Sequence, residues 1–269
     1  MDRLKQLPKL PPRELALSAA AVTAALSAVI WCVRDYHEFL ALGRGGAPYN
    51  IMGWAIVTLL RPFALSKRDA KQVSSYPADG AQEEIKGLPT RAGLPASVGG
   101  IVPHRQLSQH PPDKMKQYIT NLFKNAVAKH SDILEERLSL YERHNPALFV
   151  HANILSSDDP AVPETARIAR GEIGHIHPDF SIHLYVAPAD ARLIIEKGWG
   201  EKHRLSKPEN SLFKFKRFHI ADTYILIYGP RDEEEIDVVR KILQSSIRFM
   251  TGRPNVEVSE WRTAISPTE

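Results

Sequence analysis

The chain has 269 residues, a formal net charge of +4 and a single cysteine, Cys32. This length fits one domain of catalytic size with an appendage. The small net charge and the lack of a basic stripe with interleaved aromatic residues give no support for nucleic-acid binding. One cysteine excludes an intrachain disulfide and a cysteine metal cluster.

Residues 15–33 are an apolar run without a charge. A helix of this length rises roughly 28 Å, close to the hydrocarbon thickness of a bilayer. A cleaved signal peptide is the alternative, but its apolar core usually has about 7–15 residues and ends at small residues. This run is longer and ends at Val33 and Arg34. We therefore predict that residues 1–34 form an N-terminal segment with a transmembrane anchor.

Basic residues are denser before the anchor than directly after it, with Arg3, Lys5, Lys9 and Arg13 before it and Arg34 and Arg44 after it. The positive-inside rule then favours a cytosolic N-terminus, with most of the chain across the membrane. The N-terminal positive charge also suits anionic lipid headgroups. We expect a single-pass protein of the endoplasmic reticulum or another internal membrane, with membrane lipid as a partner.

Residues 35–112 read as juxtamembrane helices followed by a connector. A short helix is expected over residues 35–42, and residues 51–60 are almost uniformly apolar. That second run is too short to span a bilayer, so it is expected to lie in the membrane interface or to pack on the domain. Residues 66–112 are rich in Pro, Gly, Ser and charge, which predicts an irregular connector that buries little apolar surface.

Residues 113–255 carry the periodic patterns of a folded domain, and residues 256–269 follow as a C-terminal tail. Capping-box patterns at Asp132 and Asp232 mark two helix starts. Helices are expected from residue 113, over 132–141, over 189–197 and from 232 to a stop at Gly252. Strands are expected over residues 147–154, 172–177, 181–186 and 223–228. Without regular βαβ alternation, this order predicts an α+β fold with a mainly antiparallel sheet flanked by helices.

Three histidines, His175, His177 and His183, lie in the predicted hairpin. Side chains on a strand alternate between faces, so His175 and His177 point the same way. A three-residue loop at 178–180 pairs His175 with His183 and places all three rings on one face, with Tyr185 extending the row. A two-residue loop would turn His183 to the other face, so the site depends on one residue of register.

Three readings of this histidine face compete. The rings can hold zinc, iron or copper with an open coordination position. They can instead act as general bases and hydrogen-bond donors to an enolic or carboxylate substrate, because histidine titrates near neutral pH. The third reading is a set of structural or surface histidines. Buried imidazoles without partners are costly, which argues against a plain core.

Other residues near the hairpin are candidates for supporting roles. Glu172 is a candidate orienting group for a histidine. Trp199 and His203 follow the short helix, where the chain can fold back over the sheet. Arg231 ends a strand just before a capped helix and can reach an anion. No dinucleotide, phosphate-loop or serine-hydrolase motif is present in the sequence.

The sequence resembles the fungal luciferase family of luminous mushrooms from about residue 15 to residue 252. The resemblance is carried by the apolar N-terminal helix, RDYHEFL at 34–40, GEIGHIHPDFSIHL at 171–184, EKGWGEKHRL at 196–205 and YGPRDEEEIDVV at 228–239. It implies a membrane-associated oxidoreductase that needs no bound cofactor and uses O₂ as co-substrate. In that family a styryl-pyrone luciferin, 3-hydroxyhispidin, is oxidised, and CO₂ and light are released.

Such chemistry needs a base for an enolic proton, donors for the resulting oxyanion and a dry pocket. The resemblance implies that His175, His177 and His183 are catalytic. It also implies that Glu172, Tyr185, Trp199, His203, Tyr228 and Arg231 line the site of a small aromatic or pyrone substrate. A metal at the three catalytic histidines is the minority alternative.

Two departures from the family pattern stand out. The loop between the second and third histidines, residues 178–182, is shorter, and residues 206–218 match poorly. The alternatives are therefore a non-luminous acid–base or metal-dependent enzyme of fungal secondary metabolism and a non-catalytic, membrane-tethered binding domain.

Overall fold

The chain divides into two units, residues 1–43 and residues 44–269, in a computed structural model. The structure describes residues 11–206 and 220–265. Apart from Ser206, the segment 206–218 that departs from the family pattern lies outside the described residues.

The first unit holds one helix, α1 (Pro12–Ala41). The apolar run expected over 15–33 lies within it, and the separate helix expected over 35–42 continues the same helix without a break. Its most apolar window has a mean hydropathy of 2.0 and is not buried. Helix α1 is thus long and apolar enough to cross a membrane, a test that a signal sequence near the N-terminus also passes.

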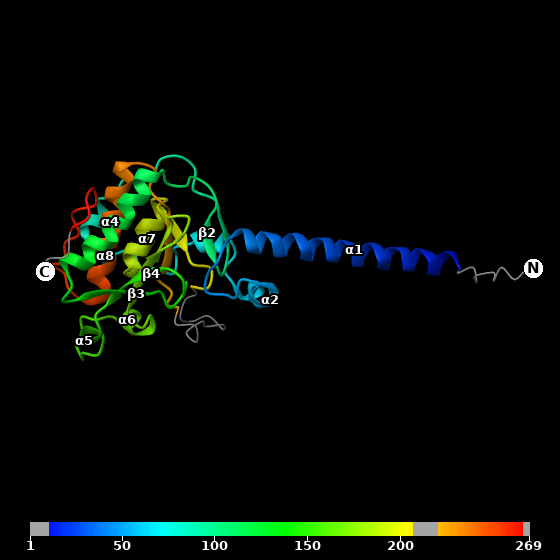
Figure 1. Ribbon diagram of the computed structural model, residues 1–269, viewed down its shortest axis with the longest axis horizontal. Coiled ribbons are helices and arrows are strands. Elements are labelled where there is room, and N and C mark those ends of the chain that lie inside the picture. The colour runs from blue at the N-terminus through cyan, green and yellow to red at the C-terminus, as the bar shows by residue number, and fades with distance from the viewer. Residues whose placement is uncertain (1–10, 207–219, 266–269) are drawn as a thin grey trace, which may run out of the picture. The chain divides into compact units, whose positions relative to one another are not determined.

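The second unit is built on an antiparallel six-stranded sheet in the order β3-β4-β5-β6-β8-β7. Its strands are β3 (Leu134–Leu138), β4 (Pro146–Val150), β5 (Glu172–Ile176), β6 (Ile182–Tyr185), β7 (Gly200–Lys202) and β8 (Tyr224–Ile227). Figure 1 shows β3 and β4 of this sheet beside the helices of the same unit. A second, two-stranded antiparallel sheet pairs β1 (Val98–Gly100) with β2 (His104–Gln106). The predicted α+β class with a mainly antiparallel sheet is confirmed, although the large sheet has more strands than the sequence indicated.

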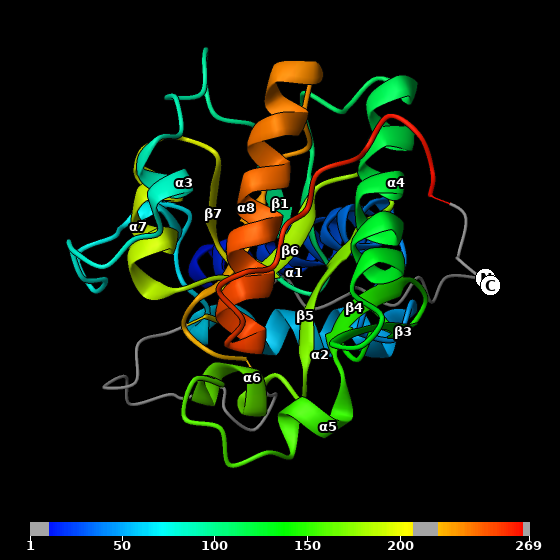
Figure 2. The same cartoon turned by 90° about the vertical axis from the view of Figure 1, so that its left-hand side faces the viewer.

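Two long helices, α4 (Asp113–Lys129) and α8 (Glu233–Thr251), lie side by side across one face of the large sheet (Figure 2). Asp232 caps α8, since its Oδ1 accepts a hydrogen bond from the Glu235 backbone N–H at 2.9 Å. The helix ends at Gly252, whose φ of +66° is the left-handed conformation that glycine adopts readily. The start and stop predicted for this helix are both confirmed.

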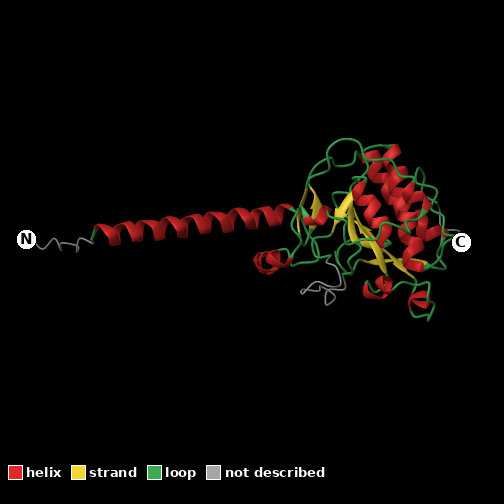
Figure 3. Cartoon of the chain, turned by 180° about the vertical axis from the view of Figure 1, so that it is seen from behind, coloured by secondary structure: helices red, strands yellow, loops and turns green. Residues whose placement is uncertain are grey.

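Shorter helices complete the unit, and Figure 3 shows them around the strands. They are α2 (Ile51–Leu60), α3 (Glu83–Lys86), α5 (Ala152–Leu155), α6 (Glu164–Ile168) and α7 (Pro188–Glu196), with 3₁₀ turns η1 (Arg61–Phe63) and η2 (Asp69–Lys71). The helix predicted over 189–197 is confirmed as α7. The strand predicted over 147–154 is only partly right, because the chain turns into α5 after Val150.

The helix predicted over 132–141 is wrong. Its central residues form β3, which pairs with β4 from Leu134↔Val150 to Leu138↔Pro146. The Asp132 capping pattern favours a helix start at one turn only, whereas all of β3 pairs with β4, the next strand along the chain. Pairing with an open sheet edge overrides the local helix signal.

The expectation that residues 66–112 bury little is also wrong. This segment contributes β1, β2 and α3, and it buries the apolar side chains of Tyr76, Ile85, Leu88 and Ile101. Long-range hydrogen bonds stabilise it: Gln106 Oε1 accepts from the Gly229 N–H at 2.8 Å, and Arg91 Nη2 donates to Glu235 Oε2 at 3.2 Å. Its Pro and Gly residues form turns of an ordered layer rather than a linker.

Gly174 is required where β5 and β6 approach each other closely. A Cβ at this position would lie 2.1 Å from the His183 carbonyl oxygen. We expect Gly174→Ala to destabilise the fold by about 1–3 kcal/mol, because strands in a packed sheet cannot move apart freely. Gly87→Ala is the matched control, since its Cβ would meet no atom closer than 3.6 Å. Thermal unfolding measures both variants, and equal melting temperatures would contradict this account.

Candidate active site

The histidine row forms as the alternation predicted. His175 pairs with His183 in the β5–β6 register, and the His177 N–H donates to the Ser181 carbonyl at 2.9 Å. The loop is therefore residues 178–180, with Phe180 at a φ of +62°. All three histidine side chains are buried. The predicted register is confirmed.

A β-bulge places Glu172 beside His175. Consecutive β4 residues Leu148 and Phe149 pair with Gly174 and Glu172, so β5 has an extra residue between them. In a regular strand, residues 172 and 175 would face opposite sides. With the bulge, Glu172 Oε1 lies 2.7 Å from His175 Nδ1.

The Glu172 carboxylate is held from two further directions. Ser139 Oγ donates to its Oε1 at 2.8 Å, and the Leu140 N–H donates to its Oε2 at 2.7 Å. A fully hydrogen-bonded carboxylate favours the His175 tautomer with a proton on Nδ1. The Nε2 atom of His175 then carries a lone pair, and it has no hydrogen-bond partner among the described residues.

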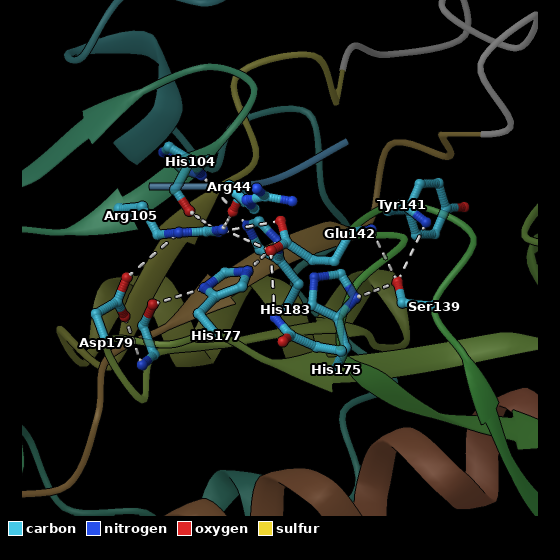
Figure 4. A network of polar contacts seen from close by, with 12 residues as sticks. Arg44, His104, Arg105, Ser139, Tyr141, Glu142, His175, His177, Asp179 and His183 are labelled. Atoms are coloured by element: carbon cyan, nitrogen blue, oxygen red, sulfur yellow. Dashed lines mark hydrogen bonds and ion pairs between the residues drawn. The ribbon is translucent and has the colours of Figure 1, made fainter. Parts of the chain in front are cut away.

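His104, at the start of β2, joins the row and was missed by the sequence reasoning. Its Nδ1 lies 3.3 Å from His183 Nε2, and His183 Nδ1 lies 3.0 Å from His177 Nε2 (Figure 4). His177 Nδ1 continues the chain to Ser181 Oγ at 2.8 Å. A neutral imidazole has one N–H, so the neutral rings in this row of hydrogen bonds all donate in the same direction.

His203 also reaches the cluster, as the sequence suggested. It directly follows β7, and its Nδ1 accepts a hydrogen bond from the Leu205 N–H at 3.1 Å. Its ring centroid lies 5.0 Å from that of His183 and 5.2 Å from that of Tyr224.

Three tyrosines extend the aromatic layer. Tyr185 stacks on Tyr224 with centroids 4.4 Å apart, and its hydroxyl hydrogen-bonds to the Tyr141 hydroxyl at 2.8 Å. The Tyr224 hydroxyl is buried and has no hydrogen-bond partner among the described residues. Burial raises the pKa of all three phenols, so they remain protonated donors at neutral pH.

Arg105 is a buried cation at one side of the cluster (Figure 4). It donates from Nη1 and Nη2 to the two carboxylate oxygens of Glu142, at 3.1 and 2.5 Å, and its Nε lies 3.8 Å from Asp179 Oδ2. Burial lowers the pKa of His177 well below its usual value, and the positive charge of Arg105 lowers it further.

A cavity of about 380 Å³ opens on this face of the sheet. The cluster contributes His104, His175, His183, His203 and Tyr224, and the other walls include Ile56, Val57, Leu60, Ile101, Val102, Tyr141, Arg143 and Arg170. None of these residues comes from α4 or α8, so the cavity lies on the face opposite those helices. Arg143 and Arg170 are exposed at its rim.

Three residues expected at the substrate site lie elsewhere, and none of them lines the cavity. Trp199 is buried, with its Nε1 donating to the Pro89 carbonyl at 2.7 Å. Tyr228 packs with Ala96 and Val98 and donates to Glu201 Oε2 at 3.1 Å. Arg231 forms an ion pair with Glu235.

The reason is the ordered segment before β1, which packs over the end of the sheet where these three side chains lie. Trp199 donates to Pro89, Arg231 donates to the Ala92 carbonyl, and Tyr228 packs with Ala96. Tyr185 belongs to the aromatic layer, but it does not line the cavity wall.

Two groups of three histidines have metal-ligand spacing. In His175, His177 and His183, and again in His104, His183 and His203, one nitrogen from each ring lies within 4.8 Å of the others. In the second group, the Leu205 N–H already occupies His203 Nδ1. The first group fits a metal better, because Glu172 and Ser181 hydrogen-bond to the outer nitrogens of His175 and His177, as supporting groups do at metal sites.

The buried histidines predict a pH-dependent stability. Burial lowers the pKa of His104, and it lowers those of His177, His183 and His203 well below the usual value. Below about pH 6.5 these histidines take up protons in the unfolded chain but not in the folded chain. This difference lowers the free energy of unfolding by up to about 1.4 kcal/mol per pH unit for each histidine. We expect stability to fall on acidification below that pH, with no such contribution above it.

Denaturant titrations between pH 7 and pH 5 measure this loss. His177→Gln should flatten the slope by about one proton, because one imidazole no longer titrates in the unfolded chain. The exposed His144 is the control, and His144→Gln should retain the wild-type slope. Equal slopes for wild type and His177→Gln would contradict the assignment.

Comparison with known proteins identifies the family of this chain. A family model described as a luciferase domain matches residues 170–246. The luciferase of Armillaria gallica is 32% identical over 255 residues, which cover 90% of this chain and 91% of that protein. Those of Armillaria mellea (32% over 265 residues, 94% and 95% covered) and Neonothopanus nambi (30% over 265 residues, 95% of each covered) are also similar. No solved structure matches this chain. The chain belongs to the luciferase family.

Proposed function

We propose that this protein is a membrane-anchored, luciferase-type oxygenase that oxidises a small enolic pyrone of the 3-hydroxyhispidin kind with O₂ and releases CO₂ and light. One observation carries the proposal. His175 lines the cavity, and its Nε2 has no hydrogen-bond partner among the described residues, while its other nitrogen hydrogen-bonds to Glu172. This is the arrangement of an oriented general base.

In the proposed first step, His175 Nε2 takes the proton of the substrate's enol. The O–H bond breaks, an N–H bond forms, and the electron pair stays on the substrate as an enolate. Glu172 stabilises the imidazolium through its hydrogen bond to Nδ1, so it is a positioning residue. The electron-rich enolate then reacts with O₂, and this step needs no further electron donor.

Hydrogen-bond donors around the cavity suit the developing oxyanion. The hydroxyl of Tyr224, which has no hydrogen-bond partner among the described residues, is the first candidate. His104 can donate from its Nε2, which likewise lacks a hydrogen-bond partner there, whereas both nitrogens of His183 already contact His104 and His177. His177 does not line this cavity. We propose that it acts by holding His183 through their 3.0 Å contact rather than by touching the substrate.

The walls also fit the need for a dry pocket. The cavity wall includes the apolar residues Ile56, Val57, Leu60, Ile101 and Val102. Excluding water strengthens the electrostatic interactions inside and limits side reactions of a reactive intermediate. At the rim, Arg143 and Arg170 can attract an anionic substrate.

The membrane part of the proposal rests on α1. We propose that it is a single membrane anchor in the endoplasmic reticulum or another internal membrane, with its N-terminus in the cytosol. Its length and apolar composition support a span, and the basic residues before it support that orientation.

Mixing the purified chain with 3-hydroxyhispidin in air, and recording light and CO₂, tests the function. His175→Gln should lower kcat by roughly 10²–10⁴-fold with a smaller effect on KM, because a general base acts in the transition state. Glu172→Gln should lower kcat less. The exposed His144 provides the control, and His144→Gln should keep full turnover.

The result that would contradict the proposal is near-normal turnover in both His175→Ala and His183→Ala, with each variant folded by circular dichroism. If the wild-type chain binds the pyrone stoichiometrically and turns none of it over, the protein is a binding domain instead.

Metal-dependent chemistry is the second candidate, favoured by the spacing of His175, His177 and His183. We expect the purified protein to contain less than one equivalent of zinc, iron or copper, and its turnover to withstand a chelator. Elemental analysis measures this directly. A stoichiometric metal that is lost in His177→Ala would establish the second candidate, because removing one of three ligands should release the ion.

A further inference from the structure

Helix α2 carries an unusual exposed apolar surface. The side chains of Ile51, Met52, Ile56 and Leu59 are 59, 62, 43 and 73% exposed. The exposed aromatic rings of Tyr49 and Phe63 flank them. We call these six residues the α2 patch. The helix has no charged residue between Ile51 and Leu60, whereas a helix that faces water normally has a charged or polar outer face.

The helix is a fixed part of the second unit. Asn50 caps it, with its Oδ1 accepting from the N–H groups of Met52 and Gly53 at 3.0 and 3.1 Å. Gly53 and Val57 are buried on its inner side. A Cβ on Gly53 would meet the Pro48 carbonyl oxygen at 1.8 Å, so the helix packs closely against the turn that leads into it. The exposed patch is therefore held in a defined position.

The patch is continuous with the mouth of the cavity. Ile56 belongs to both, since it is exposed and also lines the cavity, and Val57 and Leu60 on the same helix are cavity wall. In Figure 1, α2 lies at the margin of the unit, away from the helices α4 and α8 that cover the sheet. A molecule that covers the patch would thus lie against the entrance to the histidine cluster.

The occupant that fits is a lipid bilayer. Helix α1 ends at Ala41 and α2 begins at Ile51, so the connecting residues 42–50 can extend roughly 30 Å at most. If α1 spans the membrane, α2 cannot move far from its surface. Ten apolar residues are too few to cross a bilayer but suit its interface. The exposed Lys67 and Arg68, a few residues later, complement anionic headgroups.

We infer that the α2 patch lies in the membrane interface and that the cavity admits its substrate from the lipid. For the substrate, this inference rests on the proposed function, because a planar styryl pyrone is amphipathic and partitions into the headgroup region. Apolar side chains at the entrance then replace the acyl chains around the substrate as it enters. The polar histidine cluster lies further inside, where the enol reacts.

Depth-dependent quenching in vesicles tests the position of the patch. The full chain, with Cys32→Ser, receives one cysteine at Leu59 or at the control Leu94, which is 83% exposed and lies outside α2. Each cysteine carries an NBD dye, and the phosphatidylcholine–phosphatidylserine vesicles contain doxyl-labelled lipid. The dye at position 59 should emit at shorter wavelength and be quenched several-fold more than the dye at position 94.

Equal quenching at the two positions overturns the membrane location. A blue shift at position 59 that lipid does not quench, and that disappears on dilution, indicates pairing between two copies and also overturns it. These readouts need no turnover, so they stand whether or not 3-hydroxyhispidin is the substrate.

Kinetics test entry from the lipid. Neither Met52 nor Leu59 lines the cavity, so the double variant Met52→Glu with Leu59→Glu leaves the site intact. It should raise KM several-fold for substrate presented in vesicles and leave kcat unchanged, whereas Leu94→Glu should change neither. An unchanged KM in the double variant, in a protein whose wild-type form is active, overturns lipid entry.

Discussion

The pairing of His175 with His183 is the constraint on which the site depends. A shift by one residue would turn His183 toward the helices and separate it from its partners. Gly174 helps to fix this pairing, because only a residue without a side chain fits against the His183 carbonyl. The β4–β5 bulge adds the second condition, since it brings Glu172 to the face where His175 lies. Fold and chemistry are thus linked through a few backbone hydrogen bonds.

Burial gives these histidines their chemical character. Four rings are kept neutral at physiological pH because their desolvation disfavours the charged form. A cluster of buried polar rings stabilises a fold less than a well-packed apolar core of the same volume. The free-energy cost of burying the histidine cluster is offset by the hydrogen bonds between its rings and by the apolar sheet face under α4 and α8. Polar groups that local packing does not require are typical of functional sites.

The features that depend on neighbouring residues could be predicted from the sequence. Alternation and loop length predicted the histidine register, and capping residues predicted both ends of α8. Sequence reasoning failed where distant segments decide. His104 lies in a segment that composition describes as a connector, yet it contacts His183 from 79 positions away in sequence.

The sequence analysis named Tyr228 as a site residue, whereas the cavity is lined by Tyr224, and a distant segment again accounts for the difference. Tyr224 lies at the start of β8 and Tyr228 directly after its end, and only the packing of Ala96 and Val98 with Tyr228 shows that Tyr224 is the one that lines the cavity. The β3 strand was missed because a sheet edge outweighs the capping signal at Asp132. The bulge that turns Glu172 toward His175 likewise has no signature in the sequence.

The central claim is that His175 Nε2 and the Tyr224 hydroxyl face the enol of a bound substrate. A crystal structure with an unreactive pyrone analogue tests it most directly. The account predicts the enolic oxygen within about 2.6–3.2 Å of His175 Nε2, inside the cavity, with Glu172 still bonded to Nδ1. An analogue bound outside this cavity, or a metal ion coordinated between His175, His177 and His183, would contradict it.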